Sequence, residues 1–413
     1  MVLRFNLLIL LSFVVSFGIG QNSLEFSHEP ITERYSVLEL NVEADYFSEA
    51  IQNSLISNLA FGGAIDRASL VDMESSMNGE NTFGGWASAG IRYRALSDSI
   101  GFKSSNSLFL EFGTARYGYA TFPKDIFHLG FIGNADKLGE TLQMSHASAE
   151  YMNYQYAGLG IMNESTGSYF SFNLINVQSY FSSEVEEFTL FTAEDASELE
   201  LTYSGSVTMN DTLRGDFLSN SGTGFTLNGR YNFKVRENKD LVSLELRNLG
   251  AAILNDRTRS LKADSTWNFS GVNIDDVFSS DNPLSSITLQ DSLAYSDDQK
   301  AKNVLMPLDI NAAYFHRINK SDHFGFSVRK RFFTDHRAEI GVNYLHNETN
   351  RIGYNVGLSY GGYGRLRMNA GAHLSLENWK FYISTRNLVG AFLESGSGRS
   401  ASFGIARKFR TAS

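Results

Sequence analysis

The segment from Ile352 to Leu376 alternates apolar and polar residues in two runs that a glycine-rich turn joins, Gly361-Gly362-Tyr363-Gly364. Because side chains alternate across a β-strand, each run has one oily face and one wet face. Each run is about as long as the 9–11 residues that a tilted strand needs to cross a bilayer. The segment therefore predicts a β-hairpin in the wall of a transmembrane barrel. The apolar positions are Ile352, Tyr354, Val356, Leu358, Tyr360, Leu366, Met368, Ala370, Ala372, Leu374 and Leu376.

The same alternation recurs along the whole chain. Strong runs lie at 38–46, 87–93, 199–207, 225–235, 242–247 and 403–409. Weaker runs lie at 107–118, 150–161, 167–177, 185–192, 307–318, 323–333, 337–346 and 379–388. Counted separately, these runs give about sixteen strands; if 185–192 and 150–161 merge with their neighbours, they give about fourteen. We therefore predict an all-β fold, an antiparallel transmembrane β-barrel of about 14–16 strands.

Connection lengths sort into two classes, as the periplasmic turns and outer loops of such barrels do. Counted back from a periplasmic C-terminus, the connections expected on one side are short: 193–197, 237–239, 319–322, 347–350 and 377–378. The other side holds the long loops 47–82, 119–149 and 255–306. The first two contain helical turns and predict a cap or an inward-folding plug. The third is rich in Ser and Asp, and it predicts either a solvated surface loop or a lid that binds a partner.

The N-terminus reads as an export signal. Arg4 precedes an almost wholly apolar stretch from Leu7 to Phe17, and small residues follow up to Gly20. This predicts a signal peptide over 1–20, cleaved to leave the barrel at 21–413 in the outer membrane, with an uncleaved anchor as the alternative. No other segment reaches 18 consecutive apolar residues, so no membrane-spanning helix is expected in the mature chain.

Two segments carry a resemblance to known barrels. Residues 122–134, with Tyr151 and the run Tyr156-Ala157-Gly158-Leu159-Gly160, resemble an uncharacterised family of Bacteroidota outer-membrane β-barrels. That family is classed as a domain of unknown function. The strand-end pattern Leu246-Arg247-Asn248-Leu249-Gly250 resembles the superfamily of long-chain fatty-acid transporter barrels, which includes the shuttle barrel of the type IX secretion system.

The resemblance implies a barrel of about fourteen strands with an internal or capping plug, and it supplies no catalytic residue. The chain departs from the commonest start of the group, an early Asn-Pro-Ala stretch. Residues 31–35, Ile-Thr-Glu-Arg-Tyr, stand in that region instead. Because of this departure, the resemblance does not decide whether the N-terminal segment forms a plug.

Five polar residues are candidate ligand-binding residues of the lumen: Arg230, Lys234, Arg365, Arg367 and His373. They lie on the wet face of strongly patterned strands, where charge is costly unless water or carboxylates accompany it. The candidate carboxylate partners are Glu39, Glu43, Glu245 and Glu377. Two interpretations remain open. One is a salt-bridge network that closes or stiffens a narrow barrel; the other is a polar lining that selects an anionic or amphipathic solute.

Other chemistry has weak support. The eight histidines show no metal-ligand spacing, and Asp275-Asp276 and Asp297-Asp298 do not form a calcium loop. His146 and Ser148 share a strand face, which is a faint signal for a barrel hydrolase. The chain has no cysteine and a net charge of −10, which disfavour thiol chemistry and nucleic-acid binding. We expect no enzyme, no cofactor and no metal.

The expected function is passive transport of a small hydrophobic or amphipathic solute through a barrel in contact with outer-membrane lipid. This expectation rests on likeness of fold alone. The alternative is a non-enzymatic interaction barrel that serves a secretion or surface-assembly machine. A third reading, a soluble exported β-protein, predicts that the chain fractionates with the periplasm.

Overall fold

A computed structural model describes residues 35–96, 106–210, 219–236, 240–269, 295–347 and 351–410. The expected signal peptide at 1–20 lies outside these residues, as does part of the predicted loop 255–306, from 270 to 294. The described residues contain 19 strands in one sheet.

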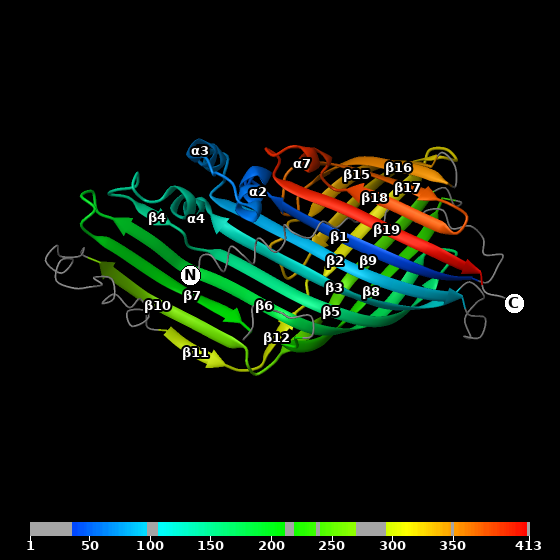
Figure 1. Ribbon diagram of the computed structural model, residues 1–413, viewed down its shortest axis with the longest axis horizontal. Coiled ribbons are helices and arrows are strands. Elements are labelled where there is room, and N and C mark those ends of the chain that lie inside the picture. The colour runs from blue at the N-terminus through cyan, green and yellow to red at the C-terminus, as the bar shows by residue number, and fades with distance from the viewer. Residues whose placement is uncertain are drawn as a thin grey trace.

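Fourteen of these strands form a closed antiparallel β-barrel, in which the first strand pairs with both the second and the last. The predicted fold class is therefore confirmed, at the lower of the two strand numbers. Figure 1 shows the two termini of the ring, β1 and β19, side by side. The strands of the ring are β1 (Tyr35–Ser48), β2 (Glu80–Leu96), β3 (Asn106–Pro123), β5 (Ala147–Asn163), β6 (Ser168–Thr192), β8 (Gly222–Val235), β9 (Asp240–Leu254), β13 (Asp309–Arg317), β14 (Asp322–Arg331), β15 (Glu339–Asn347), β16 (Ile352–Tyr360), β17 (Arg367–Ser375), β18 (Trp379–Thr385) and β19 (Gly398–Arg410).

The outer surface of the ring is apolar. Large hydrophobic side chains on many of its strands are more than a third exposed, as on a wall that faces lipid. Leu159, Leu174 and Ile383 are examples, with exposed fractions of 61%, 61% and 55%. The residues between them point inward, and many are polar and buried. No helix in the described ranges is long and apolar enough to cross a membrane.

The alternating segment 352–376 forms the hairpin of β16 and β17. Its register runs from Ile352 opposite Leu374 to Ser359 opposite Arg367. The turn needs two residues in the left-handed region, Gly361 (φ 105°) and Gly362 (φ 73°), which glycine adopts without steric cost. The predicted hairpin and its turn are confirmed.

One strand, β6, is much longer than the membrane requires. Its first part, residues 169–177, pairs with β8 in the ring, and its second part, residues 181–192, pairs with β7 (Leu199–Met209). β7 in turn pairs with β10 (Arg259–Phe269), and β10 pairs with β11 (Tyr295–Gln299). We call the second part of β6 together with β7, β10 and β11 the extension. Figure 1 shows it reaching beyond the ring, at the lower left.

The extension corrects two predictions. The turn 193–197 lies at the outer tip, on the side of the long connections, because β6 continues past the end of the ring. The segment 255–306 is not a plain loop, because it supplies β10, β11 and β12 (Lys302–Leu305). β12 continues the line of β13 along β9, with the break at 306–308.

Short helices form a cap at one end of the barrel, where the long connections meet (Figure 1). They come from the predicted inserts 47–82 and 119–149 and from the connection before β19. In the described residues these inserts pack on the rim, because Tyr46 and Phe83 of the wall join the same buried apolar cluster as Leu55, Leu70 and Phe127. The elements are α2 (Asn53–Phe61), α3 (Arg67–Ser75), α4 (Lys124–Phe127), η1 (His128–Ile132), β4 (Thr141–Gln143) and α7 (Leu388–Phe392).

Candidate functional site: a cavity in the barrel lumen

A cavity of about 590 Å³ lies inside the half of the barrel that runs from β8 to β18. Its lining extends from the β5–β6 turn at Ser165 and Thr166, at the end of the short connections, to Glu339 and Arg386 near the cap. A volume of this size falls in the usual range for small-molecule sites, about 300–1,000 Å³.

The cavity has an apolar part and a polar part. Leu241, Ala313 and Phe315 line it toward the end of the short connections, where they pack in a cluster with Leu345. Serines and asparagines of β14 to β18 line much of the remainder, together with charged residues such as Arg230, Glu245 and Arg329. The cavity therefore offers an amphipathic surface. The polar lining residues of those strands include Ser327, Asn343, Asn355, Ser359, Asn369 and Ser384.

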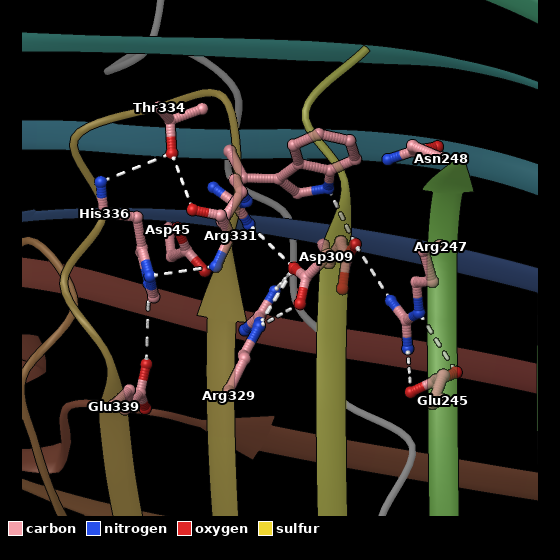
Figure 2. Close-up of polar contacts among 12 residues, drawn as sticks. Asp45, Glu245, Arg247, Asn248, Asp309, Arg329, Arg331, Thr334, His336 and Glu339 are labelled. Atoms are coloured by element: carbon pink, nitrogen blue, oxygen red, sulfur yellow. Dashed lines mark hydrogen bonds and ion pairs between the residues drawn. The ribbon is translucent and has the colours of Figure 1, made fainter. Parts of the chain in front are cut away.

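An ion-pair lattice lies between this cavity and the cap. Arg329 Nε donates to Asp309 at 2.9 Å, and Arg331 Nη2 lies 3.3 Å from the same carboxylate (Figure 2). The guanidinium of Arg331 also lies 5.1 Å from the ring centroid of Trp86. Asp309 and Arg331 are almost fully buried. Such a lattice holds its charges only because each meets an opposite charge.

Glu339 is the second centre of the lattice. It lies 3.1 Å from Arg367 and 2.5 Å from Arg386, and Arg386 reaches Asp45 on β1 at 2.8 Å. Arg367 and Arg386 also stack over Phe47, with Arg367 at 4.1 Å from the ring centroid. This cluster joins β15, β17 and the residue that follows β18 to β1 inside the barrel.

A third group lies at β8 and β9. Arg230 and Arg247 both contact Glu245, at 2.9 Å and 3.0 Å, and Arg247 approaches Glu43 at 4.0 Å. Figure 2 shows Arg247 pointing from β9 toward Glu245. Glu43 also accepts a hydrogen bond from the indole of Trp86, at 2.8 Å. The three groups together form a band of paired charges inside the barrel.

The opposite half of the lumen is filled by side chains. Trp86, Tyr117 and Tyr154 pack together, with Trp86 and Tyr117 stacked at 6.4 Å between ring centroids. Tyr117 and Tyr119 donate to the carboxylate of Glu150, at 2.7 Å and 3.0 Å. Side chains therefore fill the part of the lumen that lies beside β2, β3, β5 and β6.

The five candidate residues fall in different places. Arg230 and Lys234 line the cavity, with Arg230 buried and Lys234 exposed at the end of the short connections. Arg367 is buried in the ion-pair lattice. His373 is buried on β17 outside the cavity lining, and its ring lies against Gly353 of β16.

Arg365 is a correction. The alternation placed its side chain in the lumen, but it is exposed at the cap and donates to the carbonyl of Ser76 at 3.1 Å. The strand β17 begins at Arg367, so Arg365 belongs to the turn and the strand alternation does not reach it. Of the predicted carboxylate partners, Glu245 meets Arg230, Glu43 meets Arg247, and Glu39 meets Arg94 at 3.0 Å.

Sequence reasoning missed the asparagines of the cavity. Asn343, Asn355 and Asn369 all line it, on three adjacent strands. A signal was available, since the spacing Asn-x-Gly occurs in both arms of the hairpin, at Asn355 and at Asn369.

The described residues contain no group of three or more His, Asp and Glu side chains placed to hold a metal ion. Strand alternation placed Ser148 on the same face as His146. In the structure the Ser148 hydroxyl donates to Asp335 at 2.7 Å.

Comparisons with known proteins give one family and a set of distant folds. The model of a family described as "Family of unknown function (DUF5723)" matches residues 51–385. No curated protein matches the sequence.

Among solved structures, the chain is similar to the P. putida toluene transporter TodX, with 10% identity over 94% of this chain and 92% of that chain and a TM-score of 0.42. A FadL homologue of Pseudomonas aeruginosa matches with 9% identity, 92% and 91% coverage and a TM-score of 0.35. The translocator domain of the autotransporter NalP from Neisseria meningitidis gives 8% identity, 92% and 91% coverage and a TM-score of 0.34. At these values the likeness does not extend to function.

Proposed function

The chain belongs to the family of unknown function DUF5723, and we propose that this member is an outer-membrane barrel through which a small amphipathic solute passes by passive transport. The observation that carries the proposal is the lumen cavity of about 590 Å³, with Leu241, Ala313 and Phe315 at one part and serines and asparagines at the other. A solute with an apolar and a polar part matches both surfaces. A purely hydrophobic solute would leave buried polar groups without partners.

The ion-pair lattice stands across the path to the cap. Passage therefore requires the pairs around Asp309 and Glu339 to separate or rotate, so these pairs act as the gate. Asp309 and Glu339 each contact two guanidinium groups, so a rearranged lattice can exchange partners along the wall instead of losing them.

The test is solute uptake by proteoliposomes that contain the full chain. The probes are radiolabelled hexyl β-D-glucoside, hexanoate and glucose, compared with protein-free vesicles. We expect uptake of an amphipathic probe above the protein-free rate, and a loss of that uptake in S243W, whose indole would occupy the cavity at β9. S204W, with its bulk on the extension, serves as the matched control. Rates equal to those of protein-free vesicles for every probe would overturn the proposal.

We further propose that residues 1–20 are a signal peptide whose removal leaves the barrel in the outer membrane. We also propose that the barrel has no enzymatic activity. The apolar outer wall supports a lipid partner. Outer-membrane fractionation, heat-modifiable migration on a gel and N-terminal sequencing of the mature protein test the location and the cleavage together. Recovery of the chain in the periplasmic fraction would contradict the location, and a mature protein that still begins at Met1 would contradict the cleavage.

A second candidate function is an interaction barrel for a secretion or surface-assembly machine. The extension supports it, because one face carries aromatic pairs, Phe188 with Tyr203 and Trp267 with Phe269, at 5.7 Å and 5.5 Å between centroids. Affinity purification from solubilised membranes tests this candidate, with W267A/F269A as the matched variant. Recovery of the barrel alone from wild type, or an identical set of companions from the variant, counts against it.

A further inference from the structure

The asparagines of the cavity stand in a regular pattern with glycines. Across the sheet, Asn343 and Asn369 both face Gly357, and Asn355 faces Gly371. We call Asn343, Asn355 and Asn369 the asparagine shelf. Because all three belong to β15, β16 and β17 and point inward, they form one patch on the cavity wall.

The glycines allow the amides to lie flat. A Cβ added at Gly357 would lie 2.3 Å from Asn343 Oδ1 and 2.8 Å from Asn369 Oδ1, so both amides converge on this glycine. A Cβ at Gly371 would lie 2.5 Å from Asn355 Oδ1. With any larger residue at these positions the amides would be pushed into the lumen. The wall is therefore shaped to keep three amides at its surface and the space beside them open.

The guanidinium groups of the cavity are already paired, and the other lining cation, Lys234, is exposed at the end of the short connections. Each guanidinium that lines the cavity contacts a carboxylate: Arg230 and Arg247 with Glu245, Arg329 with Asp309, and Arg386 with Asp45 and Glu339. An ionic head group would have to compete with these contacts. A primary amide instead donates and accepts, which matches a hydroxyl group, itself a donor and an acceptor.

We propose that the asparagine shelf binds the uncharged, hydroxyl-rich head group of the solute, while the apolar part of that solute packs beside Leu241, Ala313 and Phe315. The inference rests on the proposed function, since it names the chemical class of the solute that the cavity takes. The class is that of an alkyl glycoside, a sugar-like head on a short chain. The amides discriminate among head groups by hydrogen bonding, because buried polar groups of a site reject a head that cannot pair with them.

The test is calorimetric binding to the full chain in lipid nanodiscs, with empty nanodiscs as the blank. The probes are hexyl β-D-glucoside and hexanoate, which share a chain and differ in the head. We expect the glucoside to bind more tightly than hexanoate. Asn355→Ala and Asn369→Ala should each weaken glucoside binding by roughly fivefold, the effect of one hydrogen bond, and leave hexanoate binding unchanged.

Three further variants separate recognition from folding. Gly357→Ala removes no amide, but its Cβ would meet two amides and the Val342 carbonyl oxygen, so it should weaken glucoside binding at least as much as Asn369→Ala. Gly229→Ala is its matched control, because a Cβ there meets nothing closer than 3.5 Å. Asn303→Ala, at an exposed position of β12, controls for the loss of an asparagine. Heat-modifiable migration verifies that each variant has closed its barrel.

The outcomes distinguish this inference from the proposed function. Glucoside affinity that is equal in wild type, Asn355→Ala and Asn369→Ala overturns the shelf, even if proteoliposomes still take up the probe. Hexanoate affinity equal to or tighter than that of the glucoside also overturns it. Shelf-dependent binding without any uptake overturns transport and leaves the recognition of a hydroxyl-rich head group standing.

Discussion

At the scale of single residues, Glu339 holds the lattice together because two buried guanidinium groups depend on it. Replacing it with glutamine, E339Q, would leave Arg367 and Arg386 with a neutral partner, although Arg386 keeps Asp45. Removing one partner of a buried ion pair costs about 3–5 kcal/mol, and glutamine retains part of the hydrogen bonding. We expect the free energy of unfolding, measured by denaturant titration in lipid vesicles, to fall by about 3 kcal/mol.

The control for E339Q is E198Q, in the exposed turn between β6 and β7. A surface substitution of this kind should change the unfolding free energy by less than about 0.5 kcal/mol. Equal effects of the two variants would mean that the lattice does not stabilise the barrel.

His336 gives a pH-dependent prediction in the β14–β15 connection. Burial, with Arg331 and Arg329 close by, lowers its pKa from 6.5 to about 2, although Glu339 lies 3.9 Å from Nε2. The folded protein therefore keeps this imidazole neutral, whereas the unfolded chain takes up a proton near pH 6.5. The unfolded state binds more protons below that pH, so the contribution is present above pH 6.5 and is lost as the pH falls.

The measurement is the unfolding free energy of wild type and H336Q from about pH 8 down to about pH 5, the range in which an unperturbed histidine titrates. Other groups titrate in both proteins, so the difference between the curves isolates His336. We expect wild type to lose more stability than H336Q as the pH falls. Parallel curves would show that His336 binds a proton equally in both states.

At the scale of elements, the cap depends on one asparagine. Asn53 at the start of α2 is fully buried, and its amide nitrogen donates to the carbonyls of Gly390 and Leu393, each at 3.0 Å. Its oxygen accepts from the Tyr46 hydroxyl and the Gly398 amide. N53A would leave the Gly398 amide without this acceptor, and a buried unpaired group costs about 1–3 kcal/mol. The carbonyls of Leu393 and Gly390 would each lose one of two donors and keep the Gly396 amide and Arg399, respectively.

We expect N53A to raise amide exchange over 388–398, because that segment loses its tie to α2, while exchange in β14 to β17 stays as in wild type. N58A, further along the same helix, is the control. Protection over 388–398 that survives in N53A would show that α7 holds its place without the asparagine.

Some strands of this fold can be predicted from the sequence and others cannot. Alternation predicts β16 and β17 closely, because an edge-free wall between lipid and lumen imposes a strict period of two. Strand alternation cannot show where β6 leaves the ring. Bulges near 178 and 186 shift the register of β6, and no residue type in the sequence signals them. The Leu246–Gly250 pattern, expected at a strand end, instead marks a bulge within β9, where Asn248 adopts φ 59°.

The candidate site, too, is only partly predicted by strand alternation. Inward-facing charge at Arg230 and Arg367 follows from strand alternation, whereas Arg365 escapes it by lying in the turn. The partners of a charge come from strands far apart in sequence, as with Asp45 and Arg386, so no local pattern encodes them. The cavity depends on which inward positions are small, and glycine in a strand says little until its neighbours across the sheet are known.

At the scale of the whole molecule, the number of strands in the wall depends on where β9 finds its next partner. Pairing of residues 240–247 with 309–316 leaves β7, β10 and β11 outside the ring. If the extension were part of the wall, β9 and β13 would not be neighbours. The lumen would then be wider, and the pair of Arg247 on β9 with Glu43 on β1, which spans it, would be pulled apart.

The chain has no cysteine, so paired cysteines can report this junction without background. Ser243 of β9 stands opposite Ala313 of β13, and directly opposed residues of an antiparallel pair lie about 4.5–5.5 Å apart at Cα, within disulfide range. We expect S243C/A313C to form a disulfide in outer membranes, seen as a shift in unreduced gel migration. S243C/S327C is the control: Ser327 faces Ala313 from β14, two strand spacings from β9, or about 9–10 Å, too far to bridge. A cross-link in the control, or none in S243C/A313C, would contradict the fourteen-strand ring, because each result requires a different neighbour for β9.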